Sequence, residues 1–65
     1  MANIEYSCSQ FRVRARNDHV EVIGLDHAGT EIVMWGAHST EELVVRIRNE
    51  DGRLIVSAER EEIKR

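Results

Sequence analysis

The sequence lacks proline altogether and contains only one cysteine and three aromatic residues among its 65 positions. The single cysteine, Cys8, excludes an intrachain disulfide, and no apolar signal segment precedes it. We therefore expect a cytoplasmic protein in which Cys8 is a small buried apolar residue. No run of about 18 apolar residues is present, so we expect neither a membrane-spanning helix nor a membrane partner.

Metal sites and catalytic motifs are also missing. The side chains suited to zinc are Cys8, His19, His27 and His38, which are scattered without a Cys-x-x-Cys or His-x-x-x-His pair. The chain has no glycine-rich phosphate loop, no pair of carboxylates in an apolar setting and no Ser-His-Asp arrangement. We expect no metal, no cofactor and no enzymatic activity.

The length and composition of the chain predict one globular domain covering residues 1–65. Hydrophobic residues make up 42% of the chain and charged residues 32%, and the formal net charge is −3. Such a chain does not coat nucleic acid by overall charge, although local basic clusters can exist. A domain of this size buries only about 60% of the surface that its unfolded chain exposes. Without a disulfide or a metal, we expect self-association to complete the core.

Alternation of apolar and polar residues is the dominant pattern, and it is typical of strands with one buried face. In residues 10–16, three apolar residues alternate with three arginines, and a second strand is expected over residues 20–25. The pair Asn17-Asp18 between them suits a two-residue hairpin loop. That loop predicts the following register: Ala15 opposite Val20, Arg14 opposite Glu21 and Val13 opposite Val22.

A second hairpin is predicted over residues 43–59, with the loop Asn49-Glu50-Asp51-Gly52 at its tip. Gly52 suits the left-handed backbone position that closes such a loop. Counting outward from Arg48 opposite Arg53 gives three apolar pairs on one face: Ile47 with Leu54, Val45 with Val56 and Leu43 with Ala58. The opposite face then carries Val44 and Ile55, which leaves it partly apolar.

Two further strands are expected, an N-terminal one over residues 4–8 and an unbroken apolar one over residues 31–35, buried on both sides. Residues 26–30 are expected to form a turn and residues 36–40 a loop, while residues 60–65 can be a strand, a helical turn or unstructured. The predicted fold class is all-β, a small antiparallel β-sandwich subunit built from hairpins. Its surplus apolar residues need cover from another subunit, and they are Ile32, Met34, Val44 and Ile55.

Two groups of arginines have more than one interpretation. Arg12, Arg14 and Arg16 form a basic face about 13 Å long, which either follows phosphates or is solvated, with Arg14 paired to Glu21. Arg46, Arg48 and Arg53 form a second cluster, in which the predicted register places Arg48 opposite Arg53. Like charges so placed destabilise a hairpin unless Glu50, Asp51, an anionic ligand or an RNA phosphate lies between them. Trp35 is interpreted as a core or interface residue rather than as a base-stacking platform.

The segment SQFRVRARNDHVEVIGL, residues 9–25, resembles the N-terminal part of the tryptophan RNA-binding attenuation protein (TRAP) family. The likeness rests on the alternating strand that begins with Phe11, the acidic turn and the VEVIGL strand. It continues in Gly29-Thr30 and in the stretch ELVVRIRNEDGRLIVS, residues 42–57, so it covers most of the chain.

This resemblance implies a homo-oligomeric ring in which sheets continue across subunit boundaries, with free tryptophan held in intersubunit loops and single-stranded RNA wound around the rim. The family's ligand-binding positions correspond in this chain to Asp26, Gly29, Thr30, Ile47, Asn49, Asp51 and Gly52. Only Gly29 and Thr30 keep the residue types of the family. The family's Lys-x-Arg motif falls on the uncharged Val56 and Ala58.

From the resemblance and the residues together, the candidate ligand-binding residues are Gly29, Thr30, Asn49, Asp51 and Gly52. The candidate RNA-binding residues are Arg46, Arg48 and Arg53. We expect a TRAP-like ring protein of transcription attenuation that binds RNA or a small ligand at intersubunit loops. One alternative is an assembly protein whose oligomer is itself the function, and another is a monomeric β-barrel nucleic-acid module.

Overall fold

The computed structural model describes residues 4–63, which form six antiparallel strands and no helix. The strands are β1 (Tyr6–Cys8), β2 (Gln10–Ala15), β3 (His19–Leu25), β4 (Glu31–His38), β5 (Glu41–Glu50) and β6 (Arg53–Glu62). They form two three-stranded sheets, which we call sheet A (order β1-β6-β5) and sheet B (order β2-β3-β4). The expected all-β class is therefore confirmed. Within residues 4–63 no helix is long and apolar enough to cross a membrane.

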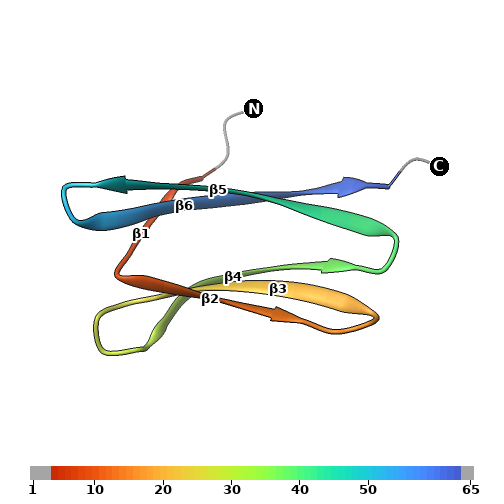
Figure 1. Cartoon of the computed structure of the whole chain (residues 1–65), viewed down its shortest axis with the longest axis horizontal. Coiled ribbons are helices and arrows are strands. Elements are labelled where there is room, and N and C mark those ends of the chain that lie inside the picture. The colour runs from red at the N-terminus through yellow and green to blue at the C-terminus, as the bar shows by residue number, and fades with distance from the viewer. Residues whose placement is uncertain (1–3, 64–65) are drawn as a thin grey trace.

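The two sheets lie as two layers, with sheet A above sheet B in Figure 1. The chain leaves sheet A after β1, builds sheet B as a β2-β3-β4 meander, and returns through a short turn to the β5-β6 hairpin of sheet A. Between the layers, β4 contacts β5 and β6, whereas β1 contacts β3. The edges formed by β2 and β5 consequently lie on opposite sides of the molecule.

The first hairpin has the predicted register. Ala15 lies opposite Val20, Arg14 opposite Glu21 and Val13 opposite Val22. The Arg16 N–H donates to the His19 carbonyl at 2.8 Å, so the turn residues are the predicted Asn17 and Asp18. Near the turn, apolar residues thereby meet on one face of sheet B and Arg14 meets Glu21 on the other, whereas further along the second face Arg12 lies opposite the apolar Ile23.

The register predicted for the second hairpin is wrong by two residues. Its turn contains only Asp51 and Gly52, whose φ angles of 52° and 78° are those of a two-residue type I′ turn. Both strands therefore extend further into the predicted loop, and the observed pairs are Glu50 with Arg53, Arg48 with Ile55, Ile47 with Val56 and Val45 with Ala58. Because the shift is an even number, every side chain stays on the face predicted for it.

Other strands also differ in length from the prediction. β4 continues through the expected loop to His38, since Trp35, Gly36 and Ala37 pair with β3. β6 extends to Glu62 and pairs with β5 as far as Glu41, so most of the described tail is a strand. Lys64 and Arg65, the end of the segment left open in the prediction, lie outside the described residues.

The core lies between the sheets and contains the expected buried cysteine. Cys8 and Val56 are fully buried, and Cys8 of β1 faces Gly24 of β3 across the layers. A Cβ atom on Gly24 would lie 2.6 Å from the Cys8 Sγ, so only glycine permits this spacing of the sheets. The rings of Tyr6 and Trp35 meet edge to face at 5.6 Å between centroids, so the half-buried Trp35 packs between the sheets at the margin of the core.

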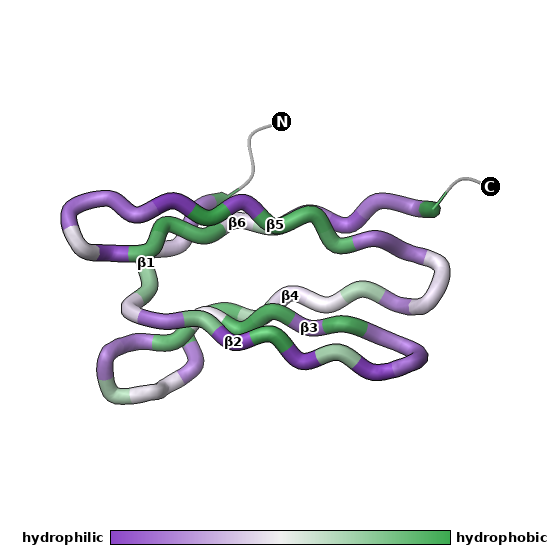
Figure 2. Tube along the Cα trace, in the orientation of Figure 1, coloured by the Kyte–Doolittle hydropathy of each residue, from purple (hydrophilic) through white to green (hydrophobic). Residues whose placement is uncertain are grey.

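Apolar side chains on the edge strands β2, β4 and β5 are left uncovered. Figure 2 shows apolar and polar residues alternating along β2 and along the middle of β5. On the inward face of β2, Phe11 is 38% and Val13 58% exposed, because sheet A does not extend over this strand. On β5, Ile47 is 40% exposed. Of the residues expected to need cover, Ile32 and Met34 are exposed, whereas Val44 and Ile55 are half-buried within the subunit.

Candidate functional site

The predicted ligand residues Gly29 and Thr30 lie in the turn between β3 and β4. The Asp26 carboxylate accepts hydrogen bonds from the N–H groups of Ala28 (2.9 Å) and Thr30 (2.8 Å). The Asp26 N–H donates to the Thr30 carbonyl, and Gly29 has a φ of 85° that glycine adopts without strain. Asp26 therefore organises this turn through both its carboxylate and its backbone, an arrangement that residues of this type often adopt.

The other predicted ligand residues lie at the β5-β6 hairpin. Asn49 pairs with Leu54 inside the sheet, and Asp51 and Gly52 form the turn itself. Figure 1 shows that this turn and the turn after β3 lie at the same end of the molecule, one in each layer. The fold therefore places the predicted ligand residues at one end, and in one subunit they belong to two separate turns.

The predicted RNA-binding arginines share the outer face of sheet A, and each has a partner. The Arg48 guanidinium contacts both oxygens of the Glu5 carboxylate, at 2.6 and 3.2 Å, and also Glu50 at 3.0 Å. Arg46 pairs with Glu59 at 3.3 Å. Three arginines thus face three carboxylates once Arg53 is included, and this face has no surplus positive charge.

Arg53 contacts β1 rather than Arg48. Its guanidinium donates to the hydroxyl of Ser7 and, at 3.3 Å, to the Ser7 carbonyl. The corrected register places Glu50 opposite Arg53 and Ile55 opposite Arg48. The like-charge pair that called for an anion between Arg48 and Arg53 is therefore absent, and of the two expected acidic partners Glu50 is the one that pairs with Arg48.

The Glu5–Arg48 pair alters the ionisation of both groups. The hydrogen bond from Arg48 lowers the pKa of the Glu5 carboxyl below its ordinary value of 4.5. Hydrogen bonds to Glu5 and then to Glu50 raise the pKa of Arg48. Glu5 lies outside the strands and 43 positions from Arg48, so sequence spacing offers no signal for this contact.

The outer face of sheet B carries the other arginine group. Arg14 lies 3.8 Å from Glu21, which confirms the predicted pair, and its side chain remains 53% exposed. Within residues 4–63, no hydrogen bond or ion pair engages the side chain of Arg12 or Arg16. This face is therefore the one on which arginines remain available.

A histidine lies at the end of the same face. His19 contacts Asp18 at 2.9 Å and Glu21 at 3.6 Å, and it pairs across the sheet with His38. The hydrogen bond from His19 lowers the pKa of the Asp18 carboxyl. Among residues 4–63 there is no group of three or more His, Cys, Asp or Glu placed to hold a metal ion.

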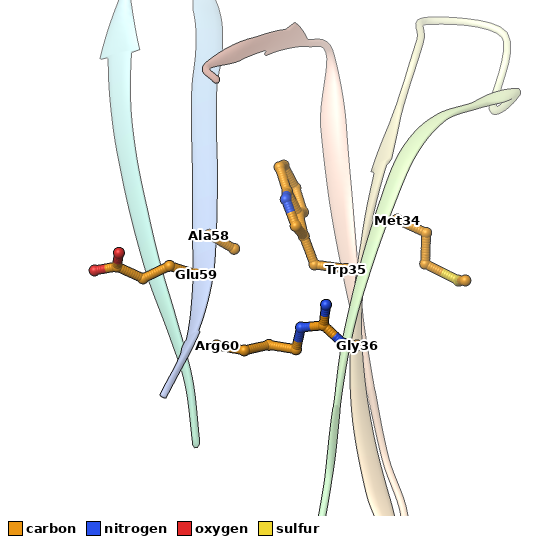
Figure 3. A pocket seen from close by; sticks show the side chains of 6 residues that line it. All are labelled: Met34, Trp35, Gly36, Ala58, Glu59 and Arg60. Carbon is orange, nitrogen blue, oxygen red and sulfur yellow. The ribbon is translucent and has the colours of Figure 1, made fainter. Parts of the chain in front are cut away.

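A groove between the layers was not predicted from the sequence. It has a volume of about 440 Å³ and is lined by β4 and β6, including Trp35, Gly36, Ala58 and Arg60. Figure 3 shows Trp35 and Arg60 directed into the space between the strands, whereas Met34 and Glu59 point away from it. A second groove of about 230 Å³ shares Gly36 and Arg60. The missed signal was the alternation of β6, which continues past Glu59 and turns Arg60 inward.

Comparison with known proteins adds no relative: no protein-family model, no curated protein and no solved structure matches this chain.

Proposed function

We propose that this chain is a non-enzymatic, ring-forming β protein similar to the TRAP family, which binds single-stranded RNA in its assembled form. The supporting observation is that, of the four edge strands within residues 4–63, β2 and β5 lie on opposite sides of the subunit. β2 pairs only with β3, and β5 pairs only with β6, so both strands carry backbone N–H and C=O groups free to extend a sheet.

The side chains at these edges fit the same purpose. Phe11 and Val13 on β2 and Ile47 on β5 are exposed on faces whose other members form the core. If β2 of one copy pairs with β5 of the next, these apolar rows become continuous and gain cover from both layers. A contact between two different edges is head-to-tail, and repeating it closes a ring when the rotation between copies returns to the first copy, whereas any other rotation gives an open filament.

A second candidate function is assembly alone, with no ligand. The observation that favours it is that predicted ligand and RNA residues have structural partners within the subunit. Asp26 is used to hold its turn, and Arg48 is held by Glu5 and Glu50. In this case the oligomer itself is the functional unit.

One titration distinguishes the two proposed functions. The protein is titrated with single-stranded RNA at low and at physiological salt, with and without free tryptophan, after its native mass has been measured. Salt-sensitive binding by a defined oligomer supports the proposed function, because phosphate contacts release counterions. A defined oligomer that binds no RNA at low salt supports assembly alone. A monomer contradicts both.

A further inference from the structure

The outer face of sheet B combines a basic row with an apolar row. Arg12, Arg14 and Arg16 recur at every second position along β2 and its continuation into the turn, so they share one side of the sheet. On that same side, Arg12 lies opposite Ile23, and Ile23 lies opposite Met34 of β4. Ile32 is two positions from Met34 and shares its face. The three strands therefore present arginines along one edge and exposed aliphatic side chains along the other.

The charges on this face are not balanced. Of the three arginines, only Arg14 contacts a carboxylate within residues 4–63, that of Glu21, and the nearby Asp18 at the turn is hydrogen bonded to His19. The chain as a whole has a net charge of −3, so this excess of positive charge is local. Sheet A, with its paired arginines, offers no comparable surface. An edge strand whose Arg12 and Arg16 side chains have no hydrogen bond or ion pair within residues 4–63 thus lies in an otherwise acidic molecule.

The apolar row is equally open. Met34 is 50% and Ile32 43% exposed, whereas Ile23 on the central strand is only 7% exposed between its neighbours. The result is a surface with an aliphatic strip beside a charged strip. Such a surface accommodates a ligand that is a regular polyanion on one side and apolar on the other.

We propose that this face binds single-stranded RNA, with the backbone phosphates on Arg12, Arg14 and Arg16 and the bases against Ile32 and Met34. The assignment rests on the RNA-binding part of the proposed function. Alternate residues of a strand are about 6.6 Å apart, a regular spacing suited to successive phosphates of an extended single strand. Guanidinium groups donate in pairs to phosphate oxygens, which favours arginine at such positions.

Regularity favours RNA over an acidic peptide or a lipid surface. Three equally spaced cations match a backbone that repeats one anion, and the adjoining apolar strip matches bases that carry no charge. The strip contains no aromatic side chain or hydrogen-bonding group for base edges, so binding has little sequence preference. Phosphate contacts dominate its free energy, and salt dependence is its signature.

The test measures the salt dependence of binding by the full chain. A fluorescein-labelled oligouridylate is titrated by anisotropy between 50 and 200 mM salt with the parent chain, with Arg12→Gln/Arg16→Gln, and with Arg46→Gln/Arg48→Gln. Three phosphate contacts per subunit give a slope of log affinity against log salt of about −2, and one contact gives about −0.7. The slope of the Arg12/Arg16 variant is therefore expected to fall to about one third of the parent value. This ratio does not depend on how many subunits one RNA molecule contacts.

The comparison variant distinguishes this site from the other arginine cluster. Arg46→Gln/Arg48→Gln removes the same charge from the opposite layer, so its slope is expected to equal that of the parent. If the salt slope falls in the Arg46/Arg48 variant alone, the assignment to Arg12, Arg14 and Arg16 is wrong, whereas RNA binding by the chain is still supported. Absence of binding by the parent chain at 50 mM salt overturns RNA binding itself. Equal affinity for polyglutamate or phosphatidylglycerol vesicles, lost in the Arg12/Arg16 variant, also overturns the assignment to RNA.

Discussion

At the scale of the residue, Gly24 sets how closely the two sheets approach. Its missing side chain leaves room for the Cys8 Sγ, and an added Cβ would also lie 3.0 Å from Val33 Cγ1. We predict that Gly24→Ala lowers the free energy of unfolding by about 1 to 3 kcal/mol, because the added methyl group overpacks the core. Urea unfolding of Gly24→Ala, Cys8→Ala and the double variant measures this. If the double variant recovers no part of the Gly24→Ala loss, the clash with Cys8 is not its cause.

Glu5 provides the prediction on pH at the same scale. Arg48 holds the folded-state pKa of Glu5 below 4.5, so the pair stabilises the fold above that pH and loses its contribution as the pH falls through the lowered pKa. We predict a midpoint below 4.5 in an NMR titration of the Glu5 side-chain carboxyl. The stability difference between the parent chain and Glu5→Gln should shrink as the pH falls. A midpoint at or above 4.5 would show that the pair does not form in solution.

At the scale of the element, the β5-β6 turn determines the register of the longest strand pair in the molecule. Gly52 has a φ of 78°, so Gly52→Ala is expected to cost about 1 kcal/mol of stability. Asp51→Asn is the matched control, because asparagine tolerates the left-handed region and should change stability little. Both are measured by urea unfolding. Equal stability of Gly52→Ala and the parent would contradict the type I′ assignment.

The two hairpins illustrate what the sequence can predict. The first register follows from Asn17-Asp18, since this choice of loop aligns Ala15 with Val20 and Val13 with Val22 and also pairs Arg14 with Glu21. In the second hairpin the apolar faces match equally well after a shift of two, so alternation alone does not decide the register. The dipeptide Asp51-Gly52 is the deciding turn signal, and it indicates a two-residue turn rather than the predicted four-residue loop Asn49-Glu50-Asp51-Gly52.

The candidate site was less predictable than the strands. The face carrying Arg12, Arg14 and Arg16 follows from alternation, because residues two apart share a side of a strand. Whether an arginine is free depends on residues brought together by the fold. The pairing of β1 with β6 brings Glu5 close enough to accept a hydrogen bond from Arg48, and Ser7 close enough to accept one from Arg53. No local pattern encodes those contacts.

At the scale of the whole molecule, the exposed apolar residues on the edge strands are the main argument for self-association. We predict that Val13→Asp separates the oligomer while the subunit stays folded, because Val13 is 58% exposed in the single subunit. Ile4→Asp is the matched control, since Ile4 is 72% exposed and lies outside the strands. Light scattering and circular dichroism distinguish dissociation from unfolding. An unchanged mass for Val13→Asp would exclude β2 from the interface.

The most direct test of the account is the native mass of the parent chain. One subunit has a mass of 7.5 kDa, and its open β2 and β5 edges predict a single defined multiple of that mass. Native mass spectrometry at physiological salt gives the number of copies. A dominant closed oligomer is the predicted result, and a dominant 7.5 kDa species would contradict the claim that the fold completes its core with further copies of itself.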